Sequence, residues 1–145
     1  MTAAKSTYDT DFVEWSSTQS ALMKNRQLQQ LDIENIIEEI ESLGKRDKRS
    51  LQSHLRILLA HMLKKKYQPE MATNSWDASI NNAKIEIRVL VDDSPSLKNE
   101  FFKVFDKVYS DARQLAKAET GLPLYTFPQM CELGEKENIY DEIFN

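Results

Sequence analysis

Carboxylates spaced three residues apart are the first candidates for chemistry in this sequence. Glu38 and Glu41 form an E-x-x-E pair within LDIENIIEEIESLGKRDKRS, and Asp11 and Glu14 form a D-x-x-E pair. This spacing places two carboxylates on one face of a helix, where they can hold Mg²⁺ or Mn²⁺ for hydrolysis of a phosphate ester or nucleotide. These four acids define one alternative function, a metal-dependent hydrolase.

The direction of the two glutamates argues against such a metal site. Each residue of a helix is turned by about 100° around the helix axis relative to the one before it. Measured from Ile36, Glu38 lies at about 200° around the axis and Glu41 at about 140°. The apolar residues of the same segment span about -20° to +100°. Only Glu39, at about -60°, lies at the edge of this stripe, where we expect a hydrogen-bonded structural carboxylate. The sequence favours a solvated acidic face, with no catalytic residue, bound metal or cofactor.

His54 and His61 project to one edge of the same helical stripe and resemble a metal-ligand pair. Seven residues of helix separate their positions by about 10.5 Å, too far for direct chelation of one ion. Neither E-x-x-H nor H-x-x-E, the spacing found in di-iron helical bundles, occurs in the chain. We expect both histidines to be hydrogen-bonded residues at the edge of the core.

Basic residues gather in one block of the chain. Residues 44–66 contain eight bases and one acid, whereas residues 1–43 contain three bases and eight acids and residues 67–145 contain eight bases and fourteen acids. The basic positions are Lys45, Arg46, Lys48, Arg49, Arg56, Lys64, Lys65 and Lys66. No helix-turn-helix or zinc motif accompanies them, so a solvated face or an acidic protein partner is favoured over nucleic acid. Nucleic-acid association remains a second alternative.

The helices that must position these groups follow from apolar residues at helical spacing. The pattern predicts helices at about 11–25, 32–67, 74–93 and 96–120, and no strand alternation appears. We expect the apolar stripes to face a core, with Trp15 and Trp76 as anchors. Glycine is about 1 kcal/mol less favourable than alanine in a helix interior. A break at Gly44 is therefore an alternative to one continuous helix.

After Gly121 the sequence shows no long period, which predicts an irregular tail packed across the bundle with about one helical turn after Glu135. The expected fold is all-α, an up-and-down bundle of about four main helices with this irregular C-terminal tail. At 145 residues the chain has the length of one domain, covering residues 1–145. Cys131 is the only cysteine, and no apolar run approaches the roughly 18 residues of a membrane span. We therefore expect a cytoplasmic protein without membrane association.

Several motifs resemble a known bacterial family in their order and spacing. They are DFVEW, the segment from Leu31 to Lys64, SW, SPSL, ETGLP and FPQMC. Together they are similar to the domain of unknown function 29 family, common in cyanobacteria, from about Tyr8 to the C-terminus. The resemblance implies an all-helical domain and no known activity. Lys65 departs from the pattern, since an aromatic residue often stands there in the family.

The sequence thus indicates a non-enzymatic interaction module that binds another protein or itself. The two alternatives make different demands on the structure. Hydrolysis requires the four acids to converge in space, and nucleic-acid binding requires an exposed and unpaired basic face.

Overall fold

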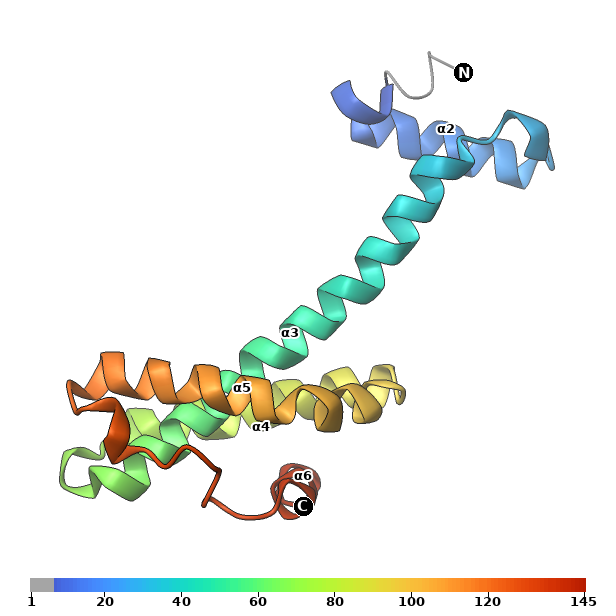
Figure 1. The fold of residues 1–145 in the computed structure, drawn as a ribbon. Helices are drawn as coiled ribbons and strands as arrows, with labels where there is room; N and C mark the ends of the chain where they lie inside the picture. The colour runs from blue at the N-terminus through green and yellow to red at the C-terminus, as the bar shows by residue number, and fades with distance from the viewer. Residues whose placement is uncertain (1–6) are drawn as a thin grey trace. The chain divides into compact units, whose positions relative to one another are not determined.

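The computed structural model describes residues 7–145, and within them every regular element is helical (Figure 1). Helical residues 7–10 precede the main elements. These are α2 (Phe12–Lys24), α3 (Ile33–Tyr67), α4 (Asn74–Asp93), α5 (Leu97–Thr120) and α6 (Lys136–Phe144), with short 3-10 turns η1 (Leu28–Gln30), η2 (Pro69–Met71) and η3 (Leu124–Thr126). The all-α prediction is confirmed, and α2 to α5 are the four main helices expected. None of the described helices is both long and apolar enough to cross a membrane.

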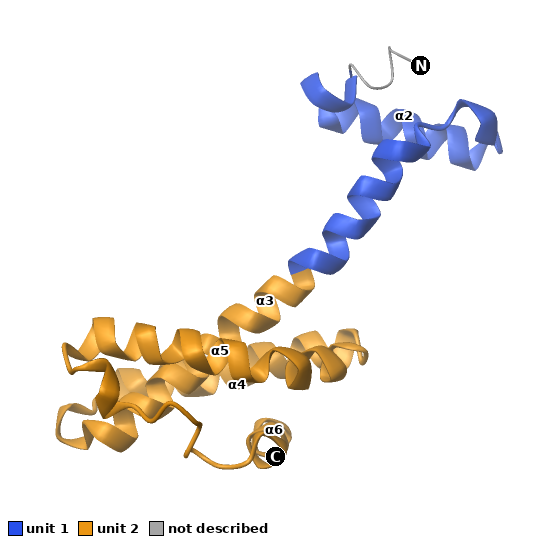
Figure 2. Ribbon diagram, in the orientation of Figure 1, with its two compact units in different colours: residues 1–46 blue, residues 47–145 orange. Residues whose placement is uncertain are grey.

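By its internal contacts the chain divides into two compact units, residues 1–46 and residues 47–145 (Figure 2). Helix α3 contributes its first turns to unit 1 and the remainder to unit 2. It passes through Gly44 without a break, so the interpretation of one continuous helix is correct. That residues 1–145 form a single domain stays a prediction.

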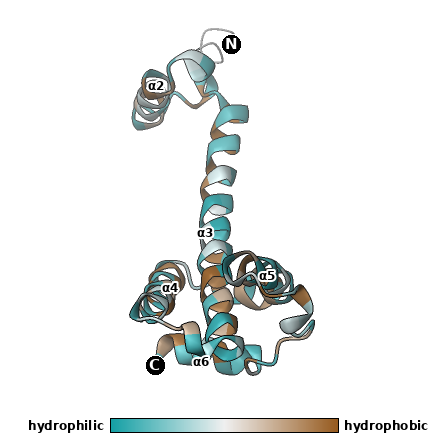
Figure 3. Cartoon of the chain, turned by 90° about the vertical axis from the view of Figure 1, so that its left-hand side faces the viewer, coloured by the Kyte–Doolittle hydropathy of each residue, from teal (hydrophilic) through white to brown (hydrophobic). Residues whose placement is uncertain are grey.

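The core of unit 2 is built from α3, α4, α5 and α6. From α3 it takes Leu51, Leu55, Leu58, Leu59 and Leu63, all fully buried. Helix α5 has buried side chains along its whole length, from Leu97 to Ala116. Figure 3 shows the brown, hydrophobic stretch of α3 beside α4 and α5. The period of 3.6 residues therefore identified this core correctly.

The segment after α5 is pinned to unit 2 by polar contacts with α5. Gly121 ends the helix with φ 74°, a left-handed conformation that glycine adopts without a steric penalty. Phe127 is fully buried, its carbonyl accepts from Arg113 Nε at 3.0 Å, and the Pro128 carbonyl accepts from Tyr109 Oη at 2.6 Å. The tail is thus irregular in conformation but held in place.

Helix α6 is longer than the single turn expected after Glu135. It runs for nine residues and buries Ile139 and Ile143, which are four apart on one face. Arg88 Nη1 of α4 donates to the carbonyl of Ile143 at 2.7 Å and so satisfies a carbonyl at the helix C-terminus. Tertiary packing supports a helix whose sequence alone carries too few turns to be recognised.

Candidate interaction surface

A buried hydrogen-bond network joins α2 to the start of α3 in unit 1. Trp15 Nε1 donates to Asp32 Oδ2 at 3.0 Å, and Asn35 Nδ2 donates to the same oxygen at 2.7 Å. The backbone N–H of Asp32 donates to Gln19 Oε1 at 2.8 Å. Trp15, Gln19 and Asp32 are all buried, so these bonds form away from bulk water. The network thus holds α2 against the N-terminal end of α3.

Gln19 keeps one polar atom without a partner. Its Oε1 must be the acceptor, because a backbone N–H points to it, and the donor Nε2 is therefore the free end. Gln19 is only 3% exposed, and within residues 7–145 its Nε2 has no hydrogen-bond partner. A buried amide donor left unpaired costs about 1–3 kcal/mol.

Beside Gln19 a groove of about 360 Å³ opens between α2 and the first turns of α3. Its walls are mainly apolar: Trp15 and Met23 come from α2, and Ile36, Ile40 and Leu43 come from α3. Glu39 and Lys24 also line it. The groove is thus mainly apolar, and the buried side chain of Gln19 lies beside it.

The groove continues onto an exposed stripe of α3, which contradicts the expectation that this stripe faces a core. Ile33, Ile37, Ile40 and Leu43 are 51%, 50%, 63% and 54% exposed. Among the described residues of unit 1, helical residues 7–10, α2 and η1 are available to cover α3, and the stripe is wider than the surface that they bury. We call Met23, Ile33, Ile37, Ile40 and Leu43 the apolar surface of unit 1.

The acids proposed for metal binding have separate roles and surroundings. Asp11 caps α2, its Oδ1 accepting from the backbone N–H of Glu14 at 3.1 Å. Glu14, Glu38 and Glu41 are exposed. Within residues 7–145, no three His, Cys, Asp or Glu side chains are arranged to hold a metal ion.

Glu39 lies at the edge of the apolar stripe and is half-buried. Its Oε1 accepts from Tyr8 Oη at 2.7 Å, and this hydrogen bond to a carboxylate raises the pKa of Tyr8 to about 12. The Tyr8 ring in turn packs against Trp15 at a centroid distance of 4.7 Å. Through Tyr8, Glu39 therefore holds helical residues 7–10 against α3.

Both histidines are half-buried in unit 2. His61 Nδ1 lies 2.9 Å from the carbonyl oxygen of Ile57, one helical turn earlier. Because a carbonyl only accepts, Nδ1 carries the proton in this contact. His61 is thus bonded within its own helix.

Three of the eight bases are engaged inside unit 2. Lys64 is 6% exposed, lies 3.0 Å from Glu119 Oε1 and places its ammonium 4.5 Å from the centre of the Trp76 ring. Lys65 pairs with Asp77 at 2.6 Å, and Lys66 donates to the carbonyl of Glu132 at 2.8 Å. Trp76 is half-buried, so it is a platform for Lys64 rather than the core anchor that we expected.

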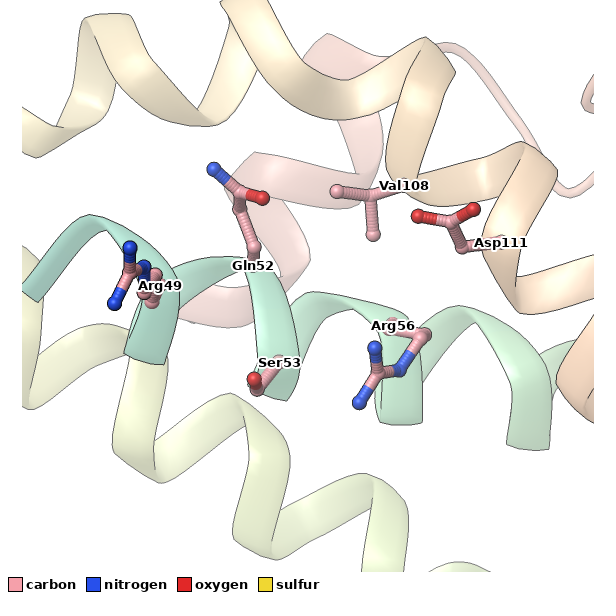
Figure 4. A pocket seen from close by; sticks show the side chains of 6 residues that line it. All are labelled: Arg49, Gln52, Ser53, Arg56, Val108 and Asp111. Atoms are coloured by element: carbon pink, nitrogen blue, oxygen red, sulfur yellow. The ribbon is translucent and has the colours of Figure 1, made fainter. Parts of the chain in front are cut away.

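The other five bases are exposed: Lys45, Arg46, Lys48, Arg49 and Arg56. Arg49 and Arg56 line a shallow pocket of about 260 Å³ with Gln52, Ser53, Val108 and Asp111. In Figure 4 the two guanidinium groups lie at separate positions along α3, and the Asp111 carboxylate lies on the α5 side. The Asp111 carboxylate in the wall offsets one of the two guanidinium charges, so the pocket is less cationic than its arginines alone would make it.

Cys131 is half-buried in the C-terminal segment. Burial raises the pKa of its thiol, which lowers the fraction of nucleophilic thiolate at neutral pH. The position has the properties of a small hydrophobic residue rather than a reactive centre.

Sequence reasoning missed Gln19, Asp32 and Asn35, which form the polar part of the groove and its support. A signal was present for two of them, Gln19 and Asp32. Gln19 follows Trp15 by four residues and so interrupts an apolar face with a polar side chain. Asp32 directly precedes the Ile-rich run, the position typical of a helix cap.

Comparisons with known proteins complete the description of the chain. Neither the search of curated proteins nor that of solved structures gave a significant match. A scan against family profiles matched residues 7–144 to the "Domain of unknown function DUF29", nearly the whole length and the range that carried the motif resemblance. The chain belongs to this DUF29 family.

Proposed function

We propose that this protein is a non-enzymatic, cytoplasmic interaction module that binds a protein partner through the apolar surface of unit 1. The observation that carries the proposal is the exposure of Ile33, Ile37, Ile40 and Leu43, each 50% or more. In unit 2 the same helix buries its leucines completely, so α3 carries one continuous stripe covered only in part. An exposed apolar patch of this kind is typical of a binding surface.

Covering this surface contributes part of the energy that association with a partner requires. Complete burial of a Leu or Ile side chain contributes about 1.5–3 kcal/mol, so covering the exposed half of four of them contributes about 3–6 kcal/mol. Burial of these side chains therefore favours an occupied groove.

The remaining candidate residues support a structural rather than a catalytic role. Asp11 caps a helix, Glu39 holds Tyr8, and Lys64 is paired with Glu119. The single cysteine fits a reducing compartment such as the cytoplasm, since no disulfide within the chain is possible.

The proposal is tested by site-specific photo-crosslinking in living cells. A photoreactive amino acid replaces Ile37 on the apolar surface or, as the control, Ile85 of α4 in unit 2, which is similarly exposed at 44%. We expect a discrete adduct from position 37 and none from position 85. Equal labelling at the two positions, or no adduct from position 37, would refute the proposed function.

A further inference from the structure

We infer that residues 44–49 of α3 form a conformational hinge, a length of helix that opens to coil and closes again while the buried parts of the chain stay folded. We call these six residues the hinge segment. The inference goes beyond the proposed function, because the hinge segment lies outside the apolar surface of unit 1. Three features of the hinge segment support it: its exposure on every side, its glycine and its order of charges.

No side of the hinge segment is buried. Each of residues 44–49 is exposed, and six consecutive helical residues point in every direction around the helix axis. Before the segment, Ile40 and Leu43 line the groove beside α2, and after it Leu51 is fully buried in the core of unit 2. Opening the hinge segment therefore uncovers no buried side chain. A length of helix without tertiary packing is only marginally stable in water, so local opening there is easy.

Gly44 lowers the helical stability at the start of the hinge segment. A Cβ added at Gly44 would meet no atom within 4 Å, so no close contact requires glycine there. The positive φ angles of the described glycines are at Gly121 and Gly134, so the backbone of Gly44 does not require glycine either. Compared with alanine, glycine shifts the equilibrium of a helical position toward coil by about four- to fivefold. Gly44 therefore favours opening at this point of α3.

The charges of the hinge segment repel one another while it is helical. Four of its six residues are basic and one is acidic. Residues three or four apart are neighbours on a helix, so the helix brings Lys45 beside Lys48 and Arg49, and Arg46 beside Arg49. Like charges at these spacings destabilise a helix. Within residues 7–145 these basic side chains form no ion pair that would offset the repulsion. Opening to coil relieves it.

The boundary between the two compact units falls inside the hinge segment, between Arg46 and Asp47 (Figure 2). The hydrogen bond from Trp15 to Asp32 in unit 1 lies before the segment along the chain. The fully buried leucines of α3 in unit 2 begin after it, at Leu51. Neither set of contacts includes a residue of the hinge segment, so the segment can open while each unit keeps its own packing.

Amide hydrogen exchange of the full chain, resolved by residue, tests the hinge. The comparison is made within α3, between residues 45–49 and residues 55–63, where Leu55, Leu58, Leu59 and Leu63 are fully buried. After correction for the intrinsic exchange rate of each amide, we expect residues 45–49 to exchange at least tenfold faster than residues 55–63. A difference of less than tenfold would overturn the inference.

Two variants test the physical cause of opening. Gly44→Ala should slow the exchange of residues 45–49 about fourfold, because alanine favours the helical state. Arg49→Glu turns two repulsive pairs, with Lys45 and with Arg46, into attractive ones and should slow this exchange at least threefold. In both variants residues 55–63 should remain the slower part of α3, which shows that the core of unit 2 is folded.

Arg56→Glu is the matched control for Arg49→Glu. It makes the same change of charge at an exposed position of α3, but no charged residue lies three or four positions from Arg56. The exchange of residues 45–49 should therefore stay within about twofold of wild type. If Gly44→Ala or Arg49→Glu leaves this exchange unchanged, or if Arg56→Glu slows it as much as Arg49→Glu does, the hinge is refuted.

Discussion

Replacing Asp32 by alanine should destabilise unit 1 more than any exposed carboxylate of the same helix. The Asp32 carboxylate accepts from buried Trp15 Nε1 at 3.0 Å and from Asn35 Nδ2 at 2.7 Å. A hydrogen bond to a charged group contributes about 1.5–3 kcal/mol, and the orphaned indole N–H adds to the loss. Because Asn35 is only half-buried and can bond to water instead, we expect a total loss of about 3 kcal/mol.

The two tryptophans make this loss measurable in one unit at a time, since Trp15 lies in unit 1 and Trp76 in unit 2. In a Trp76→Phe background, indole fluorescence during urea titration reports on Trp15 alone. The matched control is Glu38→Ala, which removes an exposed carboxylate from the same helix and should change the free energy of unfolding by less than about 0.5 kcal/mol.

Asp32→Asn separates hydrogen bonding from charge. It keeps an acceptor oxygen for Trp15 and should lose about 1 kcal/mol, less than the alanine variant. The reasoning fails if Asp32→Ala costs less than about 1 kcal/mol or no more than Glu38→Ala. Either result would mean that the network of Trp15, Gln19 and Asp32 does not hold α2 on α3.

Three further predictions concern single residues. Gly44→Ala should raise the free energy of unfolding by about 0.5–1 kcal/mol in thermal denaturation, because Gly44 lies inside a helix with open space around it. A lower free energy of unfolding would contradict this reasoning. Glu119→Gln should lower the free energy of unfolding by about 1 kcal/mol in urea titration, because it leaves the buried Lys64 without its anion. Asp77→Asn is the control: it breaks the exposed pair with Lys65 and should change the free energy of unfolding by less than about 0.5 kcal/mol. Equal losses in the two variants would contradict this prediction. Burial raises the pKa of Tyr109 from 10.0 to about 12. Between pH 10 and 12 the tyrosine therefore ionises in the unfolded chain but stays neutral in the folded one, which favours unfolding. The stabilising contribution of Tyr109 is complete below pH 10 and declines from pH 10 to 12. The stability advantage of wild type over Tyr109→Phe should shrink across this range in parallel urea titrations, and a constant difference would disprove the assignment.

Much of the fold could be predicted because long amphipathic helices carry many repeats of one period. The ends of α4 and α5 follow from local signals, with Ser94 and Pro95 between them and Gly121 closing α5. The irregular tail was harder to interpret. It has no period of its own and is held by hydrogen bonds to Tyr109 and Arg113, which local sequence does not reveal.

The candidate site was less predictable because it depends on which groups meet across elements. The spacing of Glu38 and Glu41 correctly placed both on the solvent side of α3. Gln19 and Asp32, by contrast, lie 13 residues apart on opposite sides of a turn, and only the fold brings them together. Lys64 and Glu119 are 55 residues apart and meet for the same reason.

The exposed stripe of α3 shows that an apolar helical pattern predicts a face suited to burial but does not identify the segment that covers it. Ile40 and Leu55 belong to one helix and one period, yet Ile40 is 63% exposed and Leu55 is fully buried. The difference arises because the α3 leucines of unit 2 share one buried core with α4, α5 and α6, whereas the described part of unit 1 offers α3 helical residues 7–10, α2 and η1. The hydrophobic effect acts on both segments with similar strength per unit area. A binding partner on the unit 1 stripe would give Ile40 the cover that Leu55 already has.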